Sequence, residues 1–192
     1  MGYSELKEER SVKLWIKGLL LSMSIVFLLT ACGGDQPKDP NQVTVFIMGS
    51  EGFSQELAEQ VKQELQTKLG STMKVTVNTT PIYSAEKLTL EYVDRQDDII
   101  ILPENDMKAY SVNGGHVMLD KDFDSKKYSR GVTMGSISEE DVDQQEKHLF
   151  SIPVDQMSMF KKIKYTPDNL YAAIPVFADY NKSLKILKAM TE

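Results

Sequence analysis

The stretch Val43–Gly70, VTVFIMGSEGFSQELAEQVKQELQTKLG, decides the fold class of this chain. It opens with VTVFIM, a continuous β-branched and aromatic run that is typical of a strand buried on both faces. After a turn, an apolar residue recurs every four positions and forms one stripe along a helix. These residues are Leu57, Val61, Leu65 and Leu69. With Ser54 as N-cap and Gly70 at the end of the helix, the stretch predicts a strand–turn–helix unit.

The segments that follow repeat this alternation. KVTVNT at 74–79 and DIIILP at 98–103 predict a second and a third strand. Helical patterns follow each of them, at 84–95 and at 105–112. Strands that alternate with helices favour a parallel sheet with helices on both faces. We therefore expect an α/β fold of three layers around a mostly parallel sheet.

In the helix at 84–95 we expect Leu88, Tyr92 and Val93 to share the buried face, because their spacing places them on one side. The second half of the chain has weaker patterns. HVMLD at 116–120, HLFSIPV and LYAAIPVFA predict further strands, and an amphipathic helix closes the chain. The stretch 120–147 is charged and has little periodicity, so we assign it no regular element.

Residues 1–31 have the layout of an export signal. Lys13 and Lys17 precede an apolar run at 19–29. This run is shorter than the roughly 20 apolar residues that span a membrane, which disfavours the alternative of a retained transmembrane anchor. The run ends in LTAC at 29–32. This motif resembles the lipobox of bacterial lipoproteins.

The lipobox resemblance implies that the sulfur of Cys32 carries diacylglycerol and that the signal is cleaved between Ala31 and Cys32. Cys32 is the only cysteine in the chain, so the exported protein has no internal disulfide to form. The polar segment that follows reads as a flexible tether. We expect a signal peptide at 1–31, a lipid-anchored tether at 32–42 and a single α/β domain at 43–192.

The charge of the mature chain disfavours two kinds of partner. Residues 1–31 contain four of the 22 basic and three of the 28 acidic side chains, which leaves 18 basic and 25 acidic ones, a net charge of −7. An acidic surface disfavours a nucleic-acid partner. It also disfavours electrostatic attraction to anionic lipid, so the lipid on Cys32 is expected to provide the anchor.

The order of elements carries a second resemblance. The succession VTVFIMG, helix, VTVNTT, helix, DIIILPENDMKAYSVNGGHVMLDKDF and HLFSIPVD resembles the first lobe of the extracellular solute-binding lipoproteins of ABC importers. The closing stretch at 169–192 is similar to their C-terminal return, a strand followed by a helix. Their second lobe would fall between Val154 and Asn169, where this chain has only a short segment. The resemblance implies a shortened relative with one lobe of a periplasmic-binding-protein fold.

This resemblance implies an accessory module of an ABC import system, anchored at the outer face of a Gram-positive-type cell membrane. The expected partners are an ABC permease or a full-length solute-binding protein, together with a small solute. The alternative is a lipoprotein that acts as a protein–protein adaptor and has no small-molecule ligand. A missing second lobe would leave the strand-end surface open to such a partner.

The expected binding site lies beyond the carboxyl ends of the parallel strands, where ligands bind in sheets of this kind. Its residues follow the first three predicted strands: Ser50, Glu51, Tyr83, Glu104 and Asp106. The three carboxylates favour a cationic group or a basic partner surface. The alternative is that these positions form ordinary turns, with Ser54 as a cap and glycines for backbone geometry.

We expect neither catalysis nor a cofactor. The chain lacks the G-x-S-x-G, H-E-x-x-H and P-loop motifs, and His116 and His148 each open an apolar run as strand-end residues do. DKDFD at 120–124 begins like a calcium loop, but Ser125 and Gly131 occupy the positions where glycine and glutamate are required. We therefore predict a solvated acidic turn there and no metal site.

Overall fold

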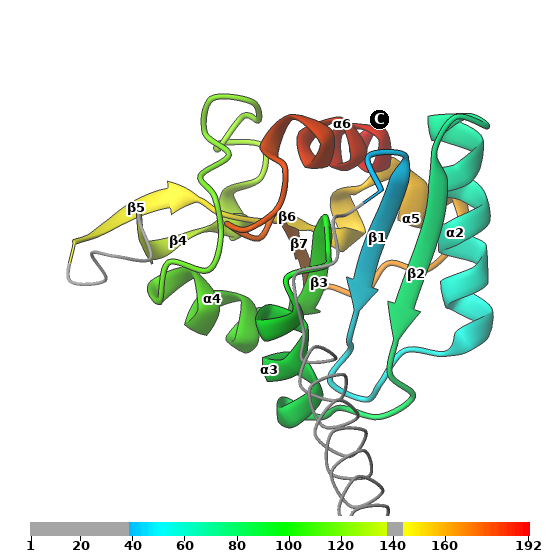
Figure 1. The fold of residues 1–192 in the computed structure, drawn as a ribbon. Helices are drawn as coiled ribbons and strands as arrows, with labels where there is room; N and C mark the ends of the chain where they lie inside the picture. Colours follow the sequence, from blue (N-terminus) through cyan, green and yellow to red (C-terminus); the bar gives the residue numbers. More distant parts are fainter. Residues whose placement is uncertain (1–38, 138–143) are drawn as a thin grey trace, which may run out of the picture. The chain divides into compact units, whose positions relative to one another are not determined.

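A mixed five-stranded sheet organises the part of the chain that the computed structural model describes, residues 39–137 and 144–192 (Figure 1). Its strands in chain order are β1 (Gln42–Ile47), β2 (Lys74–Thr79), β3 (Ile99–Pro103), β6 (Ile152–Pro153) and β7 (Leu170–Ala173). Across the sheet they lie in the order β2-β1-β3-β7-β6. The sheet belongs to one compact unit, Lys38–Glu192.

The prediction of an α/β fold is confirmed, but the prediction of a mostly parallel sheet is wrong. β1 pairs in parallel with β2 and β3. β7 runs antiparallel to both of its neighbours, β3 and β6. An apolar run such as LYAA predicts burial on both faces of a sheet, and it contains no information about the direction of the strand.

Helices cover both faces of the sheet (Figure 1). They are α2 (Gln55–Leu69), α3 (Ala85–Asp94), α4 (Glu104–Val112), α5 (Ser158–Lys162) and α6 (Tyr180–Thr191). Alternate residues of each strand point to opposite faces. Ile47 and Ile101 therefore pack with α2, α5 and α6, whereas Phe46 and Leu102 pack with α3 and α4. The result is a three-layer arrangement with two hydrophobic clusters.

The expected start of the fold is confirmed at α2. The Ser54 side chain accepts a hydrogen bond from the Leu57 N–H at 3.2 Å, and Gly70 has a positive φ of 77° after the helix. The buried face of α3 differs from the prediction. Leu88 and Glu91 are buried, but Val93 is 68% exposed. The inward stripe runs through positions 88, 91 and 92, and Val93 lies one residue further around the helix.

A second, two-stranded sheet lies in the stretch where no regular element was expected. β4 (Val132–Ser136) and β5 (Gln145–Leu149) pair antiparallel, after a short 3₁₀ helix, η1 (Ser129–Gly131). Most side chains of β5 are exposed, so its sequence has no apolar alternation to reveal a strand. A Cβ atom at Gly135 would lie 2.4 Å from the Phe150 ring, so the glycine allows β4 to pack closely there.

Three other predicted strands are wrong in part. The stretch 116–120 forms no strand, and His116 makes only an isolated bridge with Pro175. The run at 148–154 is divided between the end of β5 and β6, and only the first four residues of the run at 170–178 form β7. The chain leaves β6 through a second 3₁₀ helix, η2 (Val154–Gln156), and through α5, neither of which was predicted. Apolar runs indicate burial, but they do not show where a strand ends.

A buried ion pair joins α6 to the sheet. The Nζ atom of Lys182 lies 3.0 Å from Oδ1 of Asp98 and donates a hydrogen bond to the Gln42 carbonyl at 2.6 Å. The other carboxylate oxygen of Asp98 accepts the Thr44 N–H at 2.9 Å. The Asp98 side chain is only 2% exposed, so its charge is balanced by Lys182 rather than by water.

The predicted signal peptide, Cys32 and most of the predicted tether lie outside the described residues. The same is true of positions 138–143. Within 39–137 and 144–192, no helix is both long enough and apolar enough to cross a bilayer.

Candidate functional site

Four of the five residues predicted to form a site lie in two groups at the carboxyl ends of the first three strands. In the first group, the Tyr83 hydroxyl donates a hydrogen bond to Oδ1 of Asp106 at 3.0 Å. Partial burial and this carboxylate raise the pKa of Tyr83 above its ordinary value, so the hydroxyl keeps its proton at neutral pH.

The second group gathers around Asn169, just before β7. Its side-chain amide lies 3.4 Å from Oγ of Ser50, and its carbonyl accepts the Glu104 N–H at 3.0 Å. The Glu104 carboxylate forms an ion pair with Lys108, one turn further along α4. Glu51 is exposed and makes no hydrogen bond or ion pair with another described residue.

These contacts weaken the expected preference for a cation. Of the three carboxylates, Asp106 accepts from Tyr83 and Glu104 is neutralised by Lys108. Of the three carboxylates, only Glu51 makes no hydrogen bond or ion pair with another described residue. The strand ends therefore do not assemble three unpaired carboxylates around one point.

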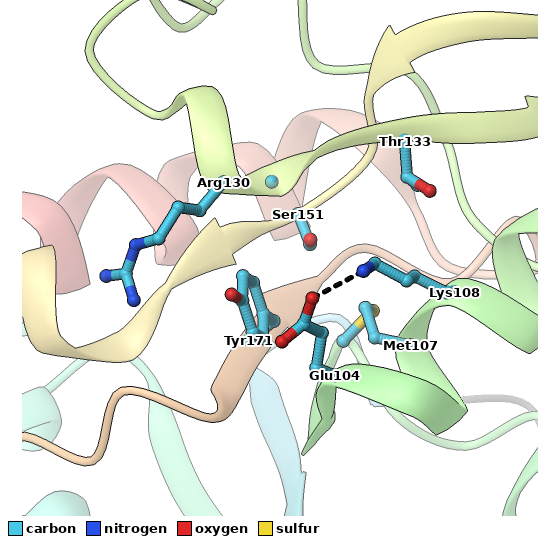
Figure 2. Close-up of a pocket in the computed structure, with 8 residues that line it drawn as sticks. Glu104, Met107, Lys108, Arg130, Thr133, Ser151 and Tyr171 are labelled. Carbon is cyan, nitrogen blue, oxygen red and sulfur yellow. Dashed lines mark hydrogen bonds and ion pairs between the residues drawn. The ribbon is translucent and has the colours of Figure 1, made fainter.

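A small pocket lies beside Glu104, on the face of the sheet that α4 covers (Figure 2). It encloses about 180 Å³ of open space, its mouth included. Its lining residues are Glu104, Met107, Lys108, Arg130, Gly131, Thr133, Ser151 and Tyr171. A water-sized sphere can enter only about 10 Å³ of this space, which is room for about one water molecule.

Three parts of the fold build the pocket. α4 supplies positions 104, 107 and 108, which share one side of the helix. Tyr171 comes from β7, where it pairs with Leu102 of β3 and Pro153 of β6. The third wall depends on Gly131, because a Cβ atom there would lie 1.7 Å from the Ser151 carbonyl. Only glycine allows the start of β4 to approach the chain at Ser151 so closely.

Two cations and one carboxylate surround the pocket. Arg130 is held in place by an ion pair with Asp155 and by a 3.1 Å hydrogen bond to the Asp168 carbonyl. Lys108 is paired with Glu104 across the mouth, as the dashed line in Figure 2 shows. Burial raises the pKa of Tyr171, and the nearby Glu104 carboxylate raises it further. The Tyr171 hydroxyl is therefore a hydrogen-bond donor at neutral pH.

The sequence analysis identified only Glu104 among these pocket residues. Two of the others could have been noticed in the sequence. Ser151 and Tyr171 carry hydroxyl groups inside the apolar runs HLFSIPV and LYAAIPVFA. A polar group within a buried run needs a partner, and this makes it informative. Lys108 and Arg130 stand in charged surroundings and gave no such signal.

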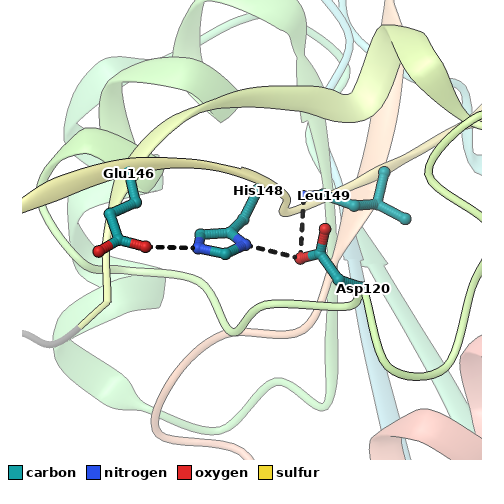
Figure 3. Close-up of polar contacts among 4 residues, drawn as sticks. All are labelled: Asp120, Glu146, His148 and Leu149. Atoms are coloured by element: carbon teal, nitrogen blue, oxygen red, sulfur yellow. Dashed lines mark hydrogen bonds and ion pairs between the residues drawn. The ribbon is translucent and has the colours of Figure 1, made fainter.

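A separate polar cluster lies around His148, near the C-terminal end of β5 (Figure 3). The His148 ring lies between two carboxylates, with Nδ1 3.2 Å from Asp120 Oδ2 and Nε2 3.0 Å from Glu146 Oε2. Since the carboxylates bond to different ring nitrogens on opposite sides, they do not converge on one point. Among the described residues, no group of three or more histidine, cysteine, aspartate or glutamate side chains is arranged to hold a metal ion.

The acidic turn at 120–124 is exposed at Asp120 and Asp124, as predicted, but two of its carboxylates also have partners in the protein. Asp120 also accepts the Leu149 N–H at 3.2 Å. Asp122 accepts hydrogen bonds from the Tyr180 hydroxyl and, at 3.0 Å, from Lys188 Nζ, and these contacts lower its pKa. These carboxylates fasten the turn to β5 and α6 instead of facing water alone.

The other histidine is part of the core. His116 Nε2 lies 2.6 Å from the Tyr92 hydroxyl, and its Nδ1 lies 2.9 Å from Ser111 Oγ. Since the Ser111 hydroxyl donates to the Met107 carbonyl, its oxygen accepts from Nδ1–H, and Nε2 accepts from Tyr92. Burial lowers the pKa of His116 to about 3, so the ring is neutral. This cluster fastens α3 and α4 together and has no exposed reactive group.

Comparison with known proteins gives no match: no family model, no curated protein and no solved structure is similar enough to this chain. The function is therefore inferred from the residues and their geometry.

Proposed function

We propose that this chain is an extracytoplasmic lipoprotein, anchored through lipid on Cys32, that serves as a solute-binding-like accessory module of an ABC import system. The observation that carries the proposal is the motif LTAC, which closes a short apolar run behind Lys13 and Lys17. A buried lipid chain contributes about 0.8 kcal/mol of membrane affinity for each methylene, and two chains give a stable anchor.

The fold supports the second half of the proposal. The resemblance to solute-binding lipoproteins implies a closing strand that returns to the sheet of the first lobe and is followed by a helix. β7 inserts between β3 and β6, and α6 follows it. The segment between β6 and β7 is short and contains only η2 and α5. With one lobe, the strand-end edge and the pocket beside Glu104 stay accessible from one side.

Replacement of Cys32 by alanine tests the anchor. Cells that grow with labelled palmitate are expected to transfer label to the wild-type protein, because the thiol of Cys32 is the attachment atom. We expect the Cys32→Ala protein to carry no label. Ser24→Ala, inside the same apolar run, is the control and should be labelled as the wild type is. Labelled Cys32→Ala protein, or unlabelled wild type, would contradict the proposal.

A second candidate function, a protein–protein adaptor, is favoured by an apolar surface on α3. Leu90 is 53% exposed and Val93 is 68% exposed, and Ile82 is exposed shortly before the helix. Exposed apolar groups that lie close together mark contact surfaces more often than isolated ones do. An adaptor would bind a permease or a full-length solute-binding protein through this surface and need no solute.

Introducing negative charges on the apolar surface of α3 distinguishes the two functions. If the chain is an adaptor, the double variant Leu90→Glu, Val93→Glu is expected to lose at least tenfold in affinity for the permease or the solute-binding protein. Thr89→Glu, exposed on the same helix, is the control. Unchanged affinity would exclude this surface. If the chain is instead a solute-binding module, adding its solute should raise the melting temperature. A ligand that binds only the folded protein adds about 2.7 kcal/mol of stability at one hundred times its Kd.

A further inference from the structure

We infer that protonation of His148 strengthens the attachment of β5 to the acidic turn at 120–124, so that the ribbon of β4 and β5 is held more firmly as the pH falls. This inference goes beyond the proposed function. It depends on the two carboxylates that flank the ring and on the backbone hydrogen bonds that share one of them.

Both ring nitrogens of His148 face a carboxylate oxygen (Figure 3). Nδ1 lies 3.2 Å from Oδ2 of Asp120, and Nε2 lies 3.0 Å from Oε2 of Glu146. A neutral ring has one N–H and donates to only one of the two, so the lone pair of its other nitrogen faces the second carboxylate. A protonated ring has two N–H groups and donates to both. The observed arrangement is therefore complete only when the ring is protonated.

The contact with Asp120 is part of the attachment of β5 to the acidic turn. The Oδ2 atom that faces the ring also accepts the Leu149 N–H at 3.2 Å, and the Leu119 N–H donates to the Leu149 carbonyl at 2.7 Å. Phe150 packs edge-on against the ring, with 6.2 Å between the ring centroids. When β5 separates from the turn, the bond between His148 and Asp120 must break. This separation costs more when the ring is charged, because the attraction between two opposite charges is then lost as well.

The other charged side chains on the elements around the ring do not reverse this preference. They are Glu104 and Lys108 of α4 at the pocket, Lys121, Asp122 and Asp124 of the turn, and Lys147 of β5. The two residues of α4 neutralise each other, and Asp122 is paired with Lys188. The remaining three are exposed, so water and salt screen their charges. Thr133, directly opposite His148 on β4, is uncharged.

The response falls in the pH range that histidine side chains cover. Histidine changes its charge between about pH 8 and about pH 5, whereas carboxyl groups of ordinary acidity stay ionised above about pH 5. The attachment is therefore firmest at the acidic end of this range, and it loses its charged component as the pH rises. A chain that is anchored outside the cytoplasm, as proposed above, experiences the pH of its surroundings.

Amide hydrogen exchange of the full chain, followed by NMR at about pH 7.5 and about pH 5.5, tests the inference. We expect the Leu119 and Leu149 amides, corrected for intrinsic exchange at each pH, to be about three- to tenfold better protected at the lower pH. The amide of Val45, in the interior of the sheet, is the reference for global unfolding. Burial disfavours protonation of His116, so acid lowers global protection through that residue, which is the opposite direction.

Three variants assign the effect to the cluster. His148→Gln keeps a polar side chain that does not titrate and should abolish the difference in protection between the two pH values. Asp120→Asn removes the negative charge beside Nδ1 and should remove most of the difference. Asp124→Asn is the matched control, because its carboxylate accepts the Lys126 N–H in the same turn, and the difference should remain. The inference is overturned if the wild type is not better protected at the lower pH, or if His148→Gln shows the same difference as the wild type.

Discussion

Replacing Lys182 by methionine is expected to lower the free energy of unfolding by about 3–5 kcal/mol. The substitution keeps the aliphatic stem and removes the ammonium that lies 3.0 Å from Asp98 Oδ1. The remaining carboxylate is 2% exposed and cannot be solvated without opening the contact between α6 and the sheet. Urea denaturation should show a lower midpoint with an unchanged slope, because the folded and unfolded surfaces stay alike.

The control and the rescue separate this charge effect from a general effect on α6. Lys185→Met alters an exposed lysine on the same helix and should change stability by less than about 0.5 kcal/mol. Asp98→Asn combined with Lys182→Met should recover most of the loss, because an asparagine oxygen can still accept the Thr44 N–H without a charge. A loss below about 1 kcal/mol in Lys182→Met would mean that water reaches Asp98 in the folded protein.

A decrease in stability between pH 6.5 and about 3 is the second large effect that we expect, and it originates at His116. Burial lowers the pKa of this ring in the folded protein from 6.5 to about 3. In that interval the unfolded chain binds the proton and the folded chain does not, so protonation favours unfolding. Above pH 6.5 the titration of His116 does not change the free energy of unfolding. Below pH 6.5 it lowers the free energy of unfolding by up to about 1.4 kcal/mol for each pH unit.

Urea unfolding at several pH values between 7 and 5 measures this contribution before most carboxylates titrate. His116→Asn should be less stable than wild type at pH 7, because it loses contacts with Tyr92 and Ser111. Its stability should also depend less on pH. If His116→Asn and wild type lose stability equally between pH 6.5 and 5, the assignment to His116 is wrong.

The first half of the fold could be predicted from the sequence because its signals are local. The apolar stripe of α2, the cap at Ser54 and the run before Pro103 each specify an element without reference to distant parts of the chain. β4, β5 and the direction of β7 depend on contacts between distant segments. β5 is polar and exposed, and β7 pairs antiparallel with a strand far away in the chain. Local periodicity does not indicate which distant strands pair with each other.

The candidate site also contains residues that could be predicted from the sequence and residues that could not. The rule that strand ends gather at one edge predicted that Ser50 and Glu104 would approach each other, and both contact Asn169. It did not predict that Lys108 would neutralise Glu104, nor that η1 would place Arg130 at the pocket. The remaining walls come from the second half of the chain, where the direction and ends of the strands were not predictable.

The position of β7 has a consequence for the way in which the chain is made. β7 lies inside the sheet, but the ribosome synthesises it after all four of the other strands. Ile100 of β3 pairs with Ala173, and Ile152 of β6 pairs with Ala172. Neither strand can therefore complete its backbone pairing before β7 has been synthesised. Because such distant pairings form slowly, the nascent polypeptide exposes an open strand edge until β7 emerges. During that interval, chaperones that bind extended apolar segments have access to β3 and β6.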